Sequence, residues 1–509
     1  MKNIILNLLK NNGFYGLLIY LFYISYRKIN KDKLKIMNYI YSLLYIIPFI
    51  RKRVNKKLKD SSQNLENELS TTYTNLFNIP NFPYTKNSIK KRIEEMKSKK
   101  IILNKVSGII YHGGENHIKK LTDIFDQFSI TNPLHPDLFP SIRNMEIDVI
   151  NMVISLFKGD NKCCGNMTYG GTESILLACL TYRDYFRKNK NISKPNIVCI
   201  ESIHPAFDKA GHYFGIELRK LKEGDHNFED FIDSNTILLV GSAPSYAHGI
   251  VDPIKKLANI AKKYKIGLHI DSCMGGFLIP FIKDYQYINF KLDGITSISI
   301  DTHKYGYSLK GSSVLLFKNL EIKKFQHYIN KTWNGGVYAT PTLMGSKSGG
   351  LIASAWASLL YIGHNNFQDY ANNIRNNLVM IKKRFDKNNN IQIIGNPNLN
   401  IIAFESNNLN IYSIIDKMKK KNWNLTVMQN PSSFHLCLTK LHDKETCNKF
   451  CEDLESSIKI VEKSGEGKLE GTLSLYGSSQ ALKDSFFIDE IIHDFVYLLS
   501  RKFISNRYE

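Results

Sequence analysis

The chain has 509 residues, 43% of them hydrophobic, which is enough for two core-forming domains and an additional segment. Its formal net charge of +22 would suit a nucleic acid or an anionic membrane, but the lysines are spread along an Asn- and Ile-rich chain without a nucleic-acid-binding signature, so no nucleic-acid partner is expected. The eight cysteines include no C-x-x-C pair, which argues against a zinc site and against a disulfide framework.

The N-terminal segment is predicted to attach the protein to a membrane. Asn11–Tyr26 is an uncharged run rich in Leu, Ile, Phe and Tyr, and Ile4–Leu9 extends it to the length of one bilayer span. Basic residues from Arg27 to Lys35 follow, which predicts a single span with the rest of the chain in the cytosol. A buried or interfacial helix and a cleaved signal peptide are the alternatives. A second uncharged run, Ile36–Ile50, precedes a basic cluster and is expected to lie in the membrane interface rather than to cross.

The middle of the chain alternates β-rich runs with helical patterns, which is typical of an α/β domain. Buried strands are predicted at Ile197–Ile200, Ile237–Val240, Ile266–Ile270, Ile295–Ile300 and Ser312–Phe317. Polar residues follow these runs, among them His204, Ser242, Asp271 and Lys304. Because ligands of open α/β sheets bind at the carboxyl ends of the strands, these residues are expected to share one site.

Lys304 is predicted to lie on a loop between two buried strands, next to Thr302 and His303. Burial there would lower the pKa of its amine and make it nucleophilic toward an aldehyde. Asp271 at the end of another strand could keep a pyridine nitrogen protonated, as pyridoxal phosphate (PLP) chemistry requires. A lysine that caps a turn and an aspartate that caps a helix are the alternatives.

A Gly-rich stretch, GGTES at Gly170–Ser174, opens a helical pattern. The unpaired N–H groups and the dipole at a helix N-terminus attract anions, so Gly171 and Thr172 are predicted to hold a phosphate group. A simple capped turn would produce the same helix without a ligand.

The segments GGTES, HPAFDKA, HIDSCMGG and DTHKYG occur in this order. Together they resemble the sphingosine-1-phosphate lyases, which are PLP-dependent enzymes of fold type I in the group II decarboxylase-like superfamily. The resemblance runs from about Lys35 to the C-terminus and includes NPLHPDLFP at Asn132–Pro140. It implies an α/β fold with a mainly parallel seven-stranded sheet flanked by helices, a small α+β C-terminal domain and an N-terminal membrane helix. The expected divisions are 1–60 (anchor), 61–130 (linker and helical arm), 131–367 (PLP-binding domain) and 368–509 (small domain).

The resemblance also implies roles for individual residues. Lys304 would anchor PLP covalently, Asp271 would face its ring nitrogen, and His204 would stack on its ring. The other residues expected at the cofactor are Gly171, Thr172, Ser242, Thr302, His303, Gly345 and Ser346. Tyr111 from the partner subunit, His135 and Lys310 would approach the substrate, and whether His135 or Lys310 is the base for its hydroxyl is left open.

Two positions depart from the family pattern. Tyr169 stands where the family has a small hydroxyl residue, and Lys347 replaces the arginine of a loop that reaches the phosphate of the neighbouring subunit's cofactor. A lysine keeps the charge but loses the bidentate geometry, so a weaker phosphate contact is expected at Lys347.

The implied activity is retro-aldol cleavage of the C2–C3 bond of a sphingoid base 1-phosphate, which yields a long-chain aldehyde and phosphoethanolamine. A homodimer with shared sites, in the endoplasmic reticulum membrane with the catalytic part facing the cytosol, is expected by the same resemblance. An amino-acid decarboxylase is the closest alternative, although Tyr305 stands where those enzymes more often have tryptophan. A catalytically silent scaffold is the other alternative.

Overall fold

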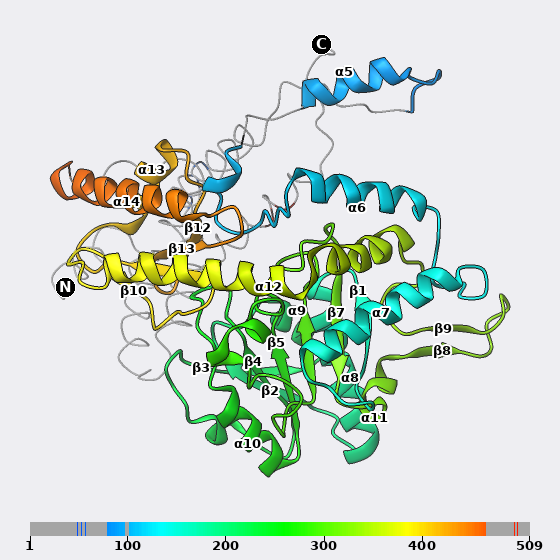
Figure 1. Ribbon diagram of the computed structural model, residues 1–509. Helices are drawn as coiled ribbons and strands as arrows, with labels where there is room; N and C mark the ends of the chain where they lie inside the picture. Colours follow the sequence, from blue (N-terminus) through cyan, green and yellow to red (C-terminus); the bar gives the residue numbers. More distant parts are fainter. Residues whose placement is uncertain are drawn as a thin grey trace. The chain divides into compact units, whose positions relative to one another are not determined.

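The computed structural model describes residues 79–96 and 101–464, together with the isolated positions 48, 52, 56, 493 and 496 (Figure 1). The chain divides into two compact units, Met1–Ile101 with Gly467–Glu509, and Ile102–Glu466. In the first unit, helix α5 spans Lys86–Met96 and has no buried residue. None of the helices in these described ranges is both long and apolar enough to cross a bilayer. The predicted membrane segments lie outside the described residues, apart from Pro48, and stay predictions.

The second unit is built on a seven-stranded mixed sheet, which confirms the predicted α/β class. Its strands are β1 (Cys164–Thr168), β2 (Asn196–Ile200), β3 (Glu217–Leu221), β4 (Thr236–Ser242), β5 (Gly267–Asp271), β6 (Ser297–Ile300) and β7 (Ser313–Phe317). They lie in the order β1-β7-β6-β5-β4-β2-β3. Neighbours from β3 to β6 pair in parallel, while β7 is antiparallel to both β6 and β1. Every residue of β2, β4, β5, β6 and β7 is buried, as expected for strands covered on both faces.

Helices cover both faces of this sheet (Figure 1). The helices of this part of the chain are α6 (Glu115–Gln127), α7 (Pro140–Leu156), α8 (Gly171–Lys190), α9 (Ala206–Phe214), α10 (Ile254–Tyr264), α11 (Leu320–Lys323) and α12 (Gly349–Phe385), with short 3₁₀ turns at Leu103–Lys105, Phe228–Phe231, Ile279–Phe281, Lys283–Tyr285 and Lys324–Gln326. Of these, α6 packs mainly on α12. Strand alternation assigns the faces, because neighbouring residues point to opposite sides of a sheet. On β4, Leu238 belongs to the apolar cluster of α8 and α9, whereas Gly241 faces Ile254 and Leu257 of α10.

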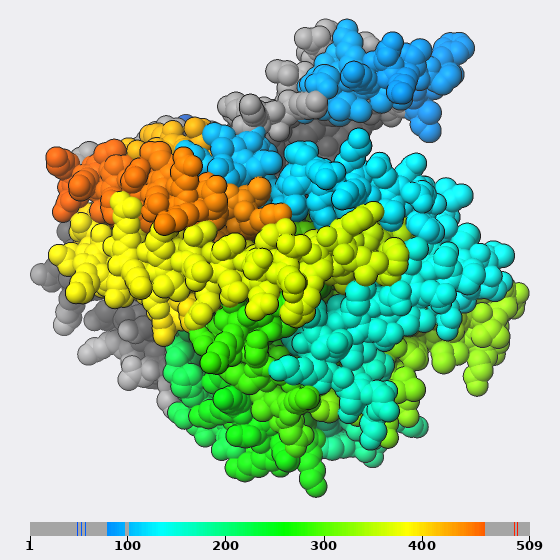
Figure 2. Space-filling view, viewed as in Figure 1, coloured from blue at the N-terminus to red at the C-terminus, as the bar shows by residue number. Residues whose placement is uncertain are grey.

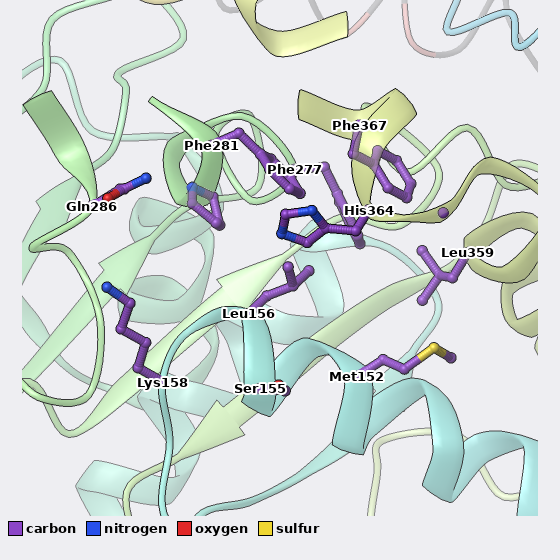
Figure 3. Close-up of a pocket in the computed structure, with 12 residues that line it drawn as sticks. Met152, Ser155, Leu156, Lys158, Phe277, Phe281, Gln286, Leu359, His364 and Phe367 are labelled. Atoms are coloured by element: carbon purple, nitrogen blue, oxygen red, sulfur yellow. The ribbon is translucent and has the colours of Figure 1, made fainter. Parts of the chain in front are cut away.

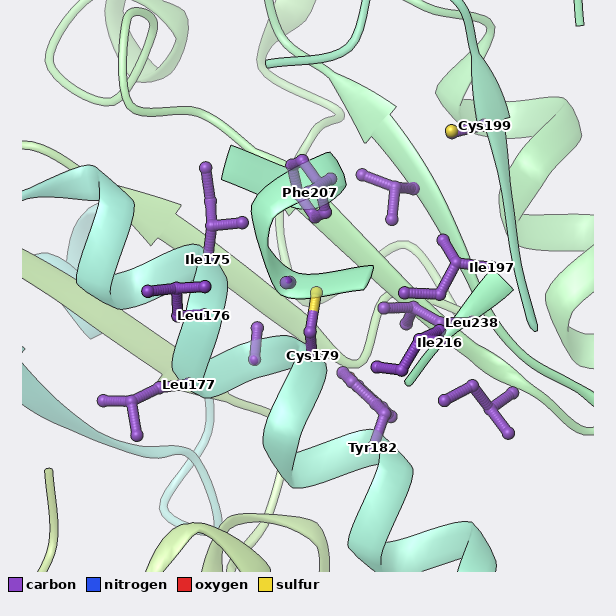
Figure 4. Packing of buried hydrophobic residues seen from close by; sticks show 14 of the residues in the cluster. Ile175, Leu176, Leu177, Cys179, Tyr182, Ile197, Cys199, Phe207, Ile216 and Leu238 are labelled. Carbon is purple, nitrogen blue, oxygen red and sulfur yellow. The ribbon is translucent and has the colours of Figure 1, made fainter. Parts of the chain in front are cut away.

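The core cluster at α8 fixes the sheet edge where the candidate site lies. Cys179 and Tyr182 of α8 pack with Ile197 of β2 and Leu238 of β4 (Figure 4). The Tyr182 hydroxyl also donates to Ser297 Oγ of β6 at 2.8 Å. The first residues of α8 are therefore held close to the carboxyl ends of β4, β5 and β6.

A smaller antiparallel sheet follows α12 in the chain. Its strands are β10 (Gln392–Ile393), β11 (Ile401–Glu405), β12 (Thr426–Met428) and β13 (Ser433–Cys437), in the order β10-β11-β13-β12, and helices α13 (Ile411–Lys420) and α14 (Lys444–Ser464) accompany them. This antiparallel sheet with its two helices is the arrangement expected of a small α+β part near the C-terminus. The expected domain boundary at 367/368 falls inside α12.

Two further features belong to the second unit. A hairpin of β8 (Tyr328–Asn330) and β9 (Tyr338–Thr340) stands out from the surface (Figure 2) and exposes 57% of Trp333. Helix α12 is kinked at Gly363, which has φ 70° and ψ 164°. A cavity of about 510 Å³ lies beside this kink, lined by apolar side chains that include Phe277, Phe281 and Phe367 (Figure 3).

Candidate active site

Three segments meet around a cavity of about 360 Å³. They are the N-terminus of α8, the end of β5 with the turn after it, and the loop from Asp301 to Ser312 that joins β6 to β7. The loop between β2 and α9 adds His204 as a fourth contribution. Six of the predicted site residues line the cavity together: Gly171, Thr172, His204, Asp271, His303 and Lys304. The other lining residues are Tyr169, Gly170, Ile175, Cys273, Asp301 and Gly311.

The Lys304 amine forms an ion pair with Asp301, whose side chain is only 1% exposed and whose Oδ2 lies 2.9 Å from Nζ. Burial lowers the pKa of Lys304, but the Asp301 carboxylate outweighs burial, so the pKa is raised above its usual range. Burial likewise raises the pKa of Asp301, and Lys304 outweighs it, so that pKa is lowered. The prediction of a lysine with a lowered pKa is therefore wrong, because desolvation acts but the carboxylate three residues earlier decides the charge.

His303 supports the same loop from the other side. Its Nδ1 donates to the carbonyl of Ser312 at 2.6 Å, and its Nε2 lies 3.9 Å from Asp301 Oδ2. Burial lowers the pKa of His303, so the imidazole is neutral and leaves Lys304 as the cation that Asp301 pairs with.

Asp271 lies at the end of β5 with its carboxylate at the cavity wall. Its Oδ1 accepts hydrogen bonds from the Cys273 amide at 3.1 Å and from Ser299 Oγ at 3.2 Å. These two donors fix the carboxylate in one orientation at the cavity wall. An anion held in this way suits the protonated nitrogen of a heterocycle.

The N-terminus of α8 is shaped for close approach. Gly170 has φ 97°, in the region that favours glycine, and a Cβ added to Gly171 would stand 2.8 Å from Cys273 Sγ and 2.9 Å from Asp301 Oδ1. Within the described part of the chain, the amides of Gly171 and Thr172 make no hydrogen bond, as expected for the first turn of a helix. They can receive a phosphate group.

These residues fit PLP. The cavity offers an amine, a fixed carboxylate and a helix N-terminus, which match the aldehyde, the ring nitrogen and the phosphate of the cofactor. In addition, Asp301 Oδ1 is buried and has no hydrogen-bond partner among the described residues. Such an atom needs a donor, and the ring substituents of a bound cofactor can supply one.

Two predicted cofactor residues support the cavity without lining it. Ser242 ends β4 beside Asp271, and its amide donates to the buried Asp252 carboxylate at 2.7 Å. Thr302 is fully buried and donates to Ser312 Oγ at 2.7 Å. Both hold the loops that carry Asp271 and Lys304, so direct cofactor contacts from them stay predictions.

Tyr111 and Lys310 lie together next to the lysine loop. Lys310 Nζ donates to the Ile109 carbonyl at 2.8 Å and lies 4.8 Å from the centre of the Tyr111 ring. The expected approach of Tyr111 to a partner subunit's site stays a prediction. The Gly108 amide donates to the Cys437 carbonyl of β13 at 2.8 Å, which holds the Tyr111 segment against its own chain.

His135, Gly345 and Ser346 do not line the cavity of their own chain. His135 is exposed, and Asn132 of the same segment donates to Ser346 Oγ at 3.1 Å. Both predicted segments are thus neighbours on one part of the surface, and their roles stay predictions.

Lys347 differs from its expected role as a free cation for a phosphate. Its Nζ lies 2.7 Å from Glu146 Oε1 of α7, and only 8% of its side chain is exposed. The ion pair already neutralises its charge, so the backbone of the loop is the better candidate for an anion contact. Tyr169, the other departure, lines the cavity, and its hydroxyl accepts the Ser348 amide.

Asp301 and Cys273 are two polar cavity residues whose roles the motifs did not identify. Both stood inside recognised segments, DTHK and DSCM, but nothing in the sequence shows which way their side chains point. The i, i+3 spacing of Asp301 and Lys304 on a tight turn is the one available signal for their pairing.

Replacing Asp301 by asparagine is expected to lower the pKa of Lys304, because the anion that raises it is removed while the shape is kept. PLP uptake by the apoprotein depends on the neutral amine, so the pH profile of the uptake rate should move to lower pH. At neutral pH the rate should rise about tenfold for each pKa unit that Lys304 loses. Stopped-flow absorbance between pH 6 and 9 measures the profile. An unchanged profile would show that Asp301 does not control Lys304, and exposed Asp230→Asn is the control.

Comparisons with known proteins agree with this site. Residues 110–407 match the family described as the pyridoxal-dependent decarboxylase conserved domain. The chain is 36% identical over 472 residues to sphingosine-1-phosphate lyase of Saccharomyces cerevisiae, covering 88% of this chain and 80% of that protein. It is 39% identical over 406 residues to the Dictyostelium discoideum sphingosine-1-phosphate lyase, covering 77% of this chain and 76% of that protein.

Solved structures show the same similarity. The sphingosine-1-phosphate lyase of Burkholderia pseudomallei superposes with a TM-score of 0.73 and 32% identity, covering 76% of this chain and 93% of that one. A glutamate decarboxylase of Lactobacillus brevis superposes with a TM-score of 0.68 at 16% identity, covering 78% of this chain and 97% of that one, which shows the shared fold alone.

Proposed function

The chain belongs to the sphingosine-1-phosphate lyase family of the pyridoxal-dependent decarboxylases, and from this we propose that it cleaves phosphorylated sphingoid bases at the C2–C3 bond. The products are a long-chain fatty aldehyde and phosphoethanolamine. The observation that carries the proposal is the meeting of Lys304, Asp271 and the α8 N-terminus in one cavity of a chain 36% identical to such lyases over most of its length.

PLP, when bound, supplies an electron sink for the carbon that bears the substrate's amine. The Gly171 and Thr172 amides would hold its phosphate, and the Asp271 carboxylate would keep the proton on its ring nitrogen. Lys304 Nζ carries a proton that Asp301 stabilises, so it is placed to return a proton to the carbon left by cleavage. Asp301 remains ionised and holds the amine in place.

Lys310 is the residue of this chain best suited to take the proton of the substrate's hydroxyl group. Burial and the positive charge of Lys304 lower the pKa of Lys310, so its amine is closer to neutral than an exposed lysine. It also lies on the loop that carries Lys304, next to Tyr111, whereas His135 is exposed. Neither side chain lines the cavity of its own chain.

An amino-acid decarboxylase on the same fold is the alternative, since decarboxylases share the fold at low identity. A substrate panel separates the two reactions. The PLP-loaded protein is expected to release long-chain aldehyde from sphinganine 1-phosphate and no carbon dioxide from glutamate, tyrosine or tryptophan. Carbon dioxide release with no aldehyde would replace the lyase proposal.

We also propose a single-span anchor in the endoplasmic reticulum membrane with the catalytic unit facing the cytosol. Support comes from the uncharged run at Asn11–Tyr26, the basic residues after it, and an alkyl substrate that partitions into bilayers. Deleting residues 1–59 is expected to move the protein from the membrane pellet to the supernatant, with activity on detergent-solubilised substrate kept within about twofold. Folded but inactive truncated protein would contradict a role limited to anchoring.

A homodimer with shared sites is proposed as well, because the His135 and Ser346 segments lie together on the surface and neither residue lines the cavity of its own chain. If the sites are shared, a mixture of refolded Lys304→Ala and His135→Ala chains should regain part of the activity that each lacks. No recovery in mixed dimers would contradict shared sites.

A further inference from the structure

The side chain of Tyr305, next to Lys304, ties the lysine loop to the smaller sheet. Its hydroxyl donates to the Leu438 carbonyl at 2.7 Å and accepts from Asn400 Nδ2 at 2.7 Å, with Cys437 Sγ at 3.4 Å. Asn400 directly precedes β11, and Cys437 and Leu438 lie at the end of β13. Only 1% of Tyr305 is exposed. The loop is thus joined to two strands more than ninety residues away in sequence.

Tyr305 also contacts the residues next to the substrate side of the cavity. Its ring meets the Tyr111 ring edge-on, with 5.1 Å between the centroids and 69° between the planes. Lys310 Nζ lies over the Tyr111 ring, 4.8 Å from its centroid. One buried side chain therefore touches the lysine loop, the Tyr111 segment and the small sheet.

Loss of the buried Tyr305 hydroxyl would leave its hydrogen-bond partners unpaired. Without it, the Asn400 amide and the Leu438 carbonyl would both lose a partner in a site closed to water, and Asn400 Oδ1 already has none among the described residues. Buried polar groups left unpaired are costly, so the loop or the strands would shift to find new partners. Such a shift would move Lys304, whose backbone is adjacent.

We propose that Tyr305 is a positioning residue of the active site, which sets the direction of Lys304 toward Asp301 and the placement of Tyr111 and Lys310 from the small sheet. It does not line the cavity and is not expected to touch the cofactor or the substrate. Only the kinetic readout of this inference rests on the proposed function. The spectrum of the lysine-bound cofactor is independent of it, because that spectrum needs no substrate.

Tyr307 offers a matched control two residues further along the same loop. It is 2% exposed. Its buried hydroxyl has no hydrogen-bond partner within the described ranges, although the Lys440 backbone is nearby. Tyr307→Phe therefore removes the same atom from the same loop but breaks no hydrogen bond.

The test compares Tyr305→Phe with Tyr307→Phe as PLP-loaded full-length proteins. For Tyr305→Phe, the pH midpoint of the visible cofactor band should move. The kcat should fall about tenfold and KM should change less than twofold, as expected for the loss of about one net hydrogen bond that orients the site. Tyr307→Phe should match the wild type in both. A band titration for Tyr305→Phe that is indistinguishable from that of Tyr307→Phe would overturn the inference, whatever the substrate proves to be.

Asn400→Ala gives a second route if Tyr305→Phe does not fold. It removes the donor from the small sheet and should shift the band in the same direction, because it breaks one of the two hydrogen bonds that hold the same hydroxyl. Combining it with Tyr305→Phe should add less than twofold to the effect of Tyr305→Phe, since that change already breaks the hydrogen bond to Asn400. Independent, multiplying effects on kcat would contradict a shared role.

Discussion

Lys304→Ala is expected to lower turnover by at least about 10³-fold and to remove the visible band of the lysine-bound cofactor. The variant loses both the nucleophilic amine and the proton that Asp301 stabilises beside the cavity. Absorbance spectra and initial rates of the PLP-reconstituted protein measure the two effects. The visible band is the more direct readout, because it reports the covalent anchor without any substrate.

The same variant leaves the Asp301 carboxylate buried without its cation, so thermal stability should also fall. Lys304→Arg keeps a cation for Asp301 and separates lost chemistry from lost folding. Lys188→Ala, at an exposed position of α8, is the matched surface control. A band that persists in Lys304→Ala would show that a different lysine holds the cofactor.

Asp271→Asn is expected to lower kcat by roughly 10² to 10³-fold while PLP still binds to Lys304. Asparagine keeps the size of the side chain and can still accept the hydrogen bonds from Cys273 and Ser299. It carries no charge, so it cannot hold a proton on the ring nitrogen of the cofactor. Rates at saturating substrate and PLP content per chain measure the two quantities.

Asp293→Asn is the control for this charge change, because Asp293 is exposed and pairs only with Lys262 at the surface among the described residues. Near-normal kcat for Asp271→Asn with full PLP content would remove Asp271 from its assigned role. Loss of PLP together with activity would instead mean that the carboxylate is needed for binding.

The sequence predicted the strands that carry the site because they are buried on both faces and rich in Ile, Leu and Val. Two strands of the same sheet were missed. β1 has the composition CGNMT, with one large apolar residue, and β3 at the sheet edge is partly exposed. Neither shows the apolar run or the alternation by which a strand is identified from sequence.

The cavity could be predicted as far as the backbone determines it. Lys304, Asp271, His204 and the α8 N-terminus follow strands that end at one edge of the sheet, so the order of the motifs was sufficient to group them. Side-chain pairing was not predictable in this way. The charge of Lys304 depends on the direction of Asp301, and the charge of Lys347 is neutralised by Glu146, which is 201 residues away in the chain.

Tyr305 shows the same limit. The sequence placed it beside Lys304 and distinguished it from the tryptophan of related decarboxylases, but only the fold brings Asn400 and Leu438 to its hydroxyl. Contacts between a loop of the large sheet and strands of the small sheet have no local sequence signal. These contacts determine how Lys304 is held, although Lys304 itself can be identified from its motif.

The most direct test of the lyase assignment is a product balance. PLP-loaded full-length protein is incubated with sphinganine 1-phosphate, and long-chain aldehyde and phosphoethanolamine are quantified by mass spectrometry alongside a Lys304→Ala control. Equal amounts of both products from the wild type and neither from the control are expected for C2–C3 cleavage at this site. Absence of both products from fully PLP-loaded wild-type protein would contradict the assignment.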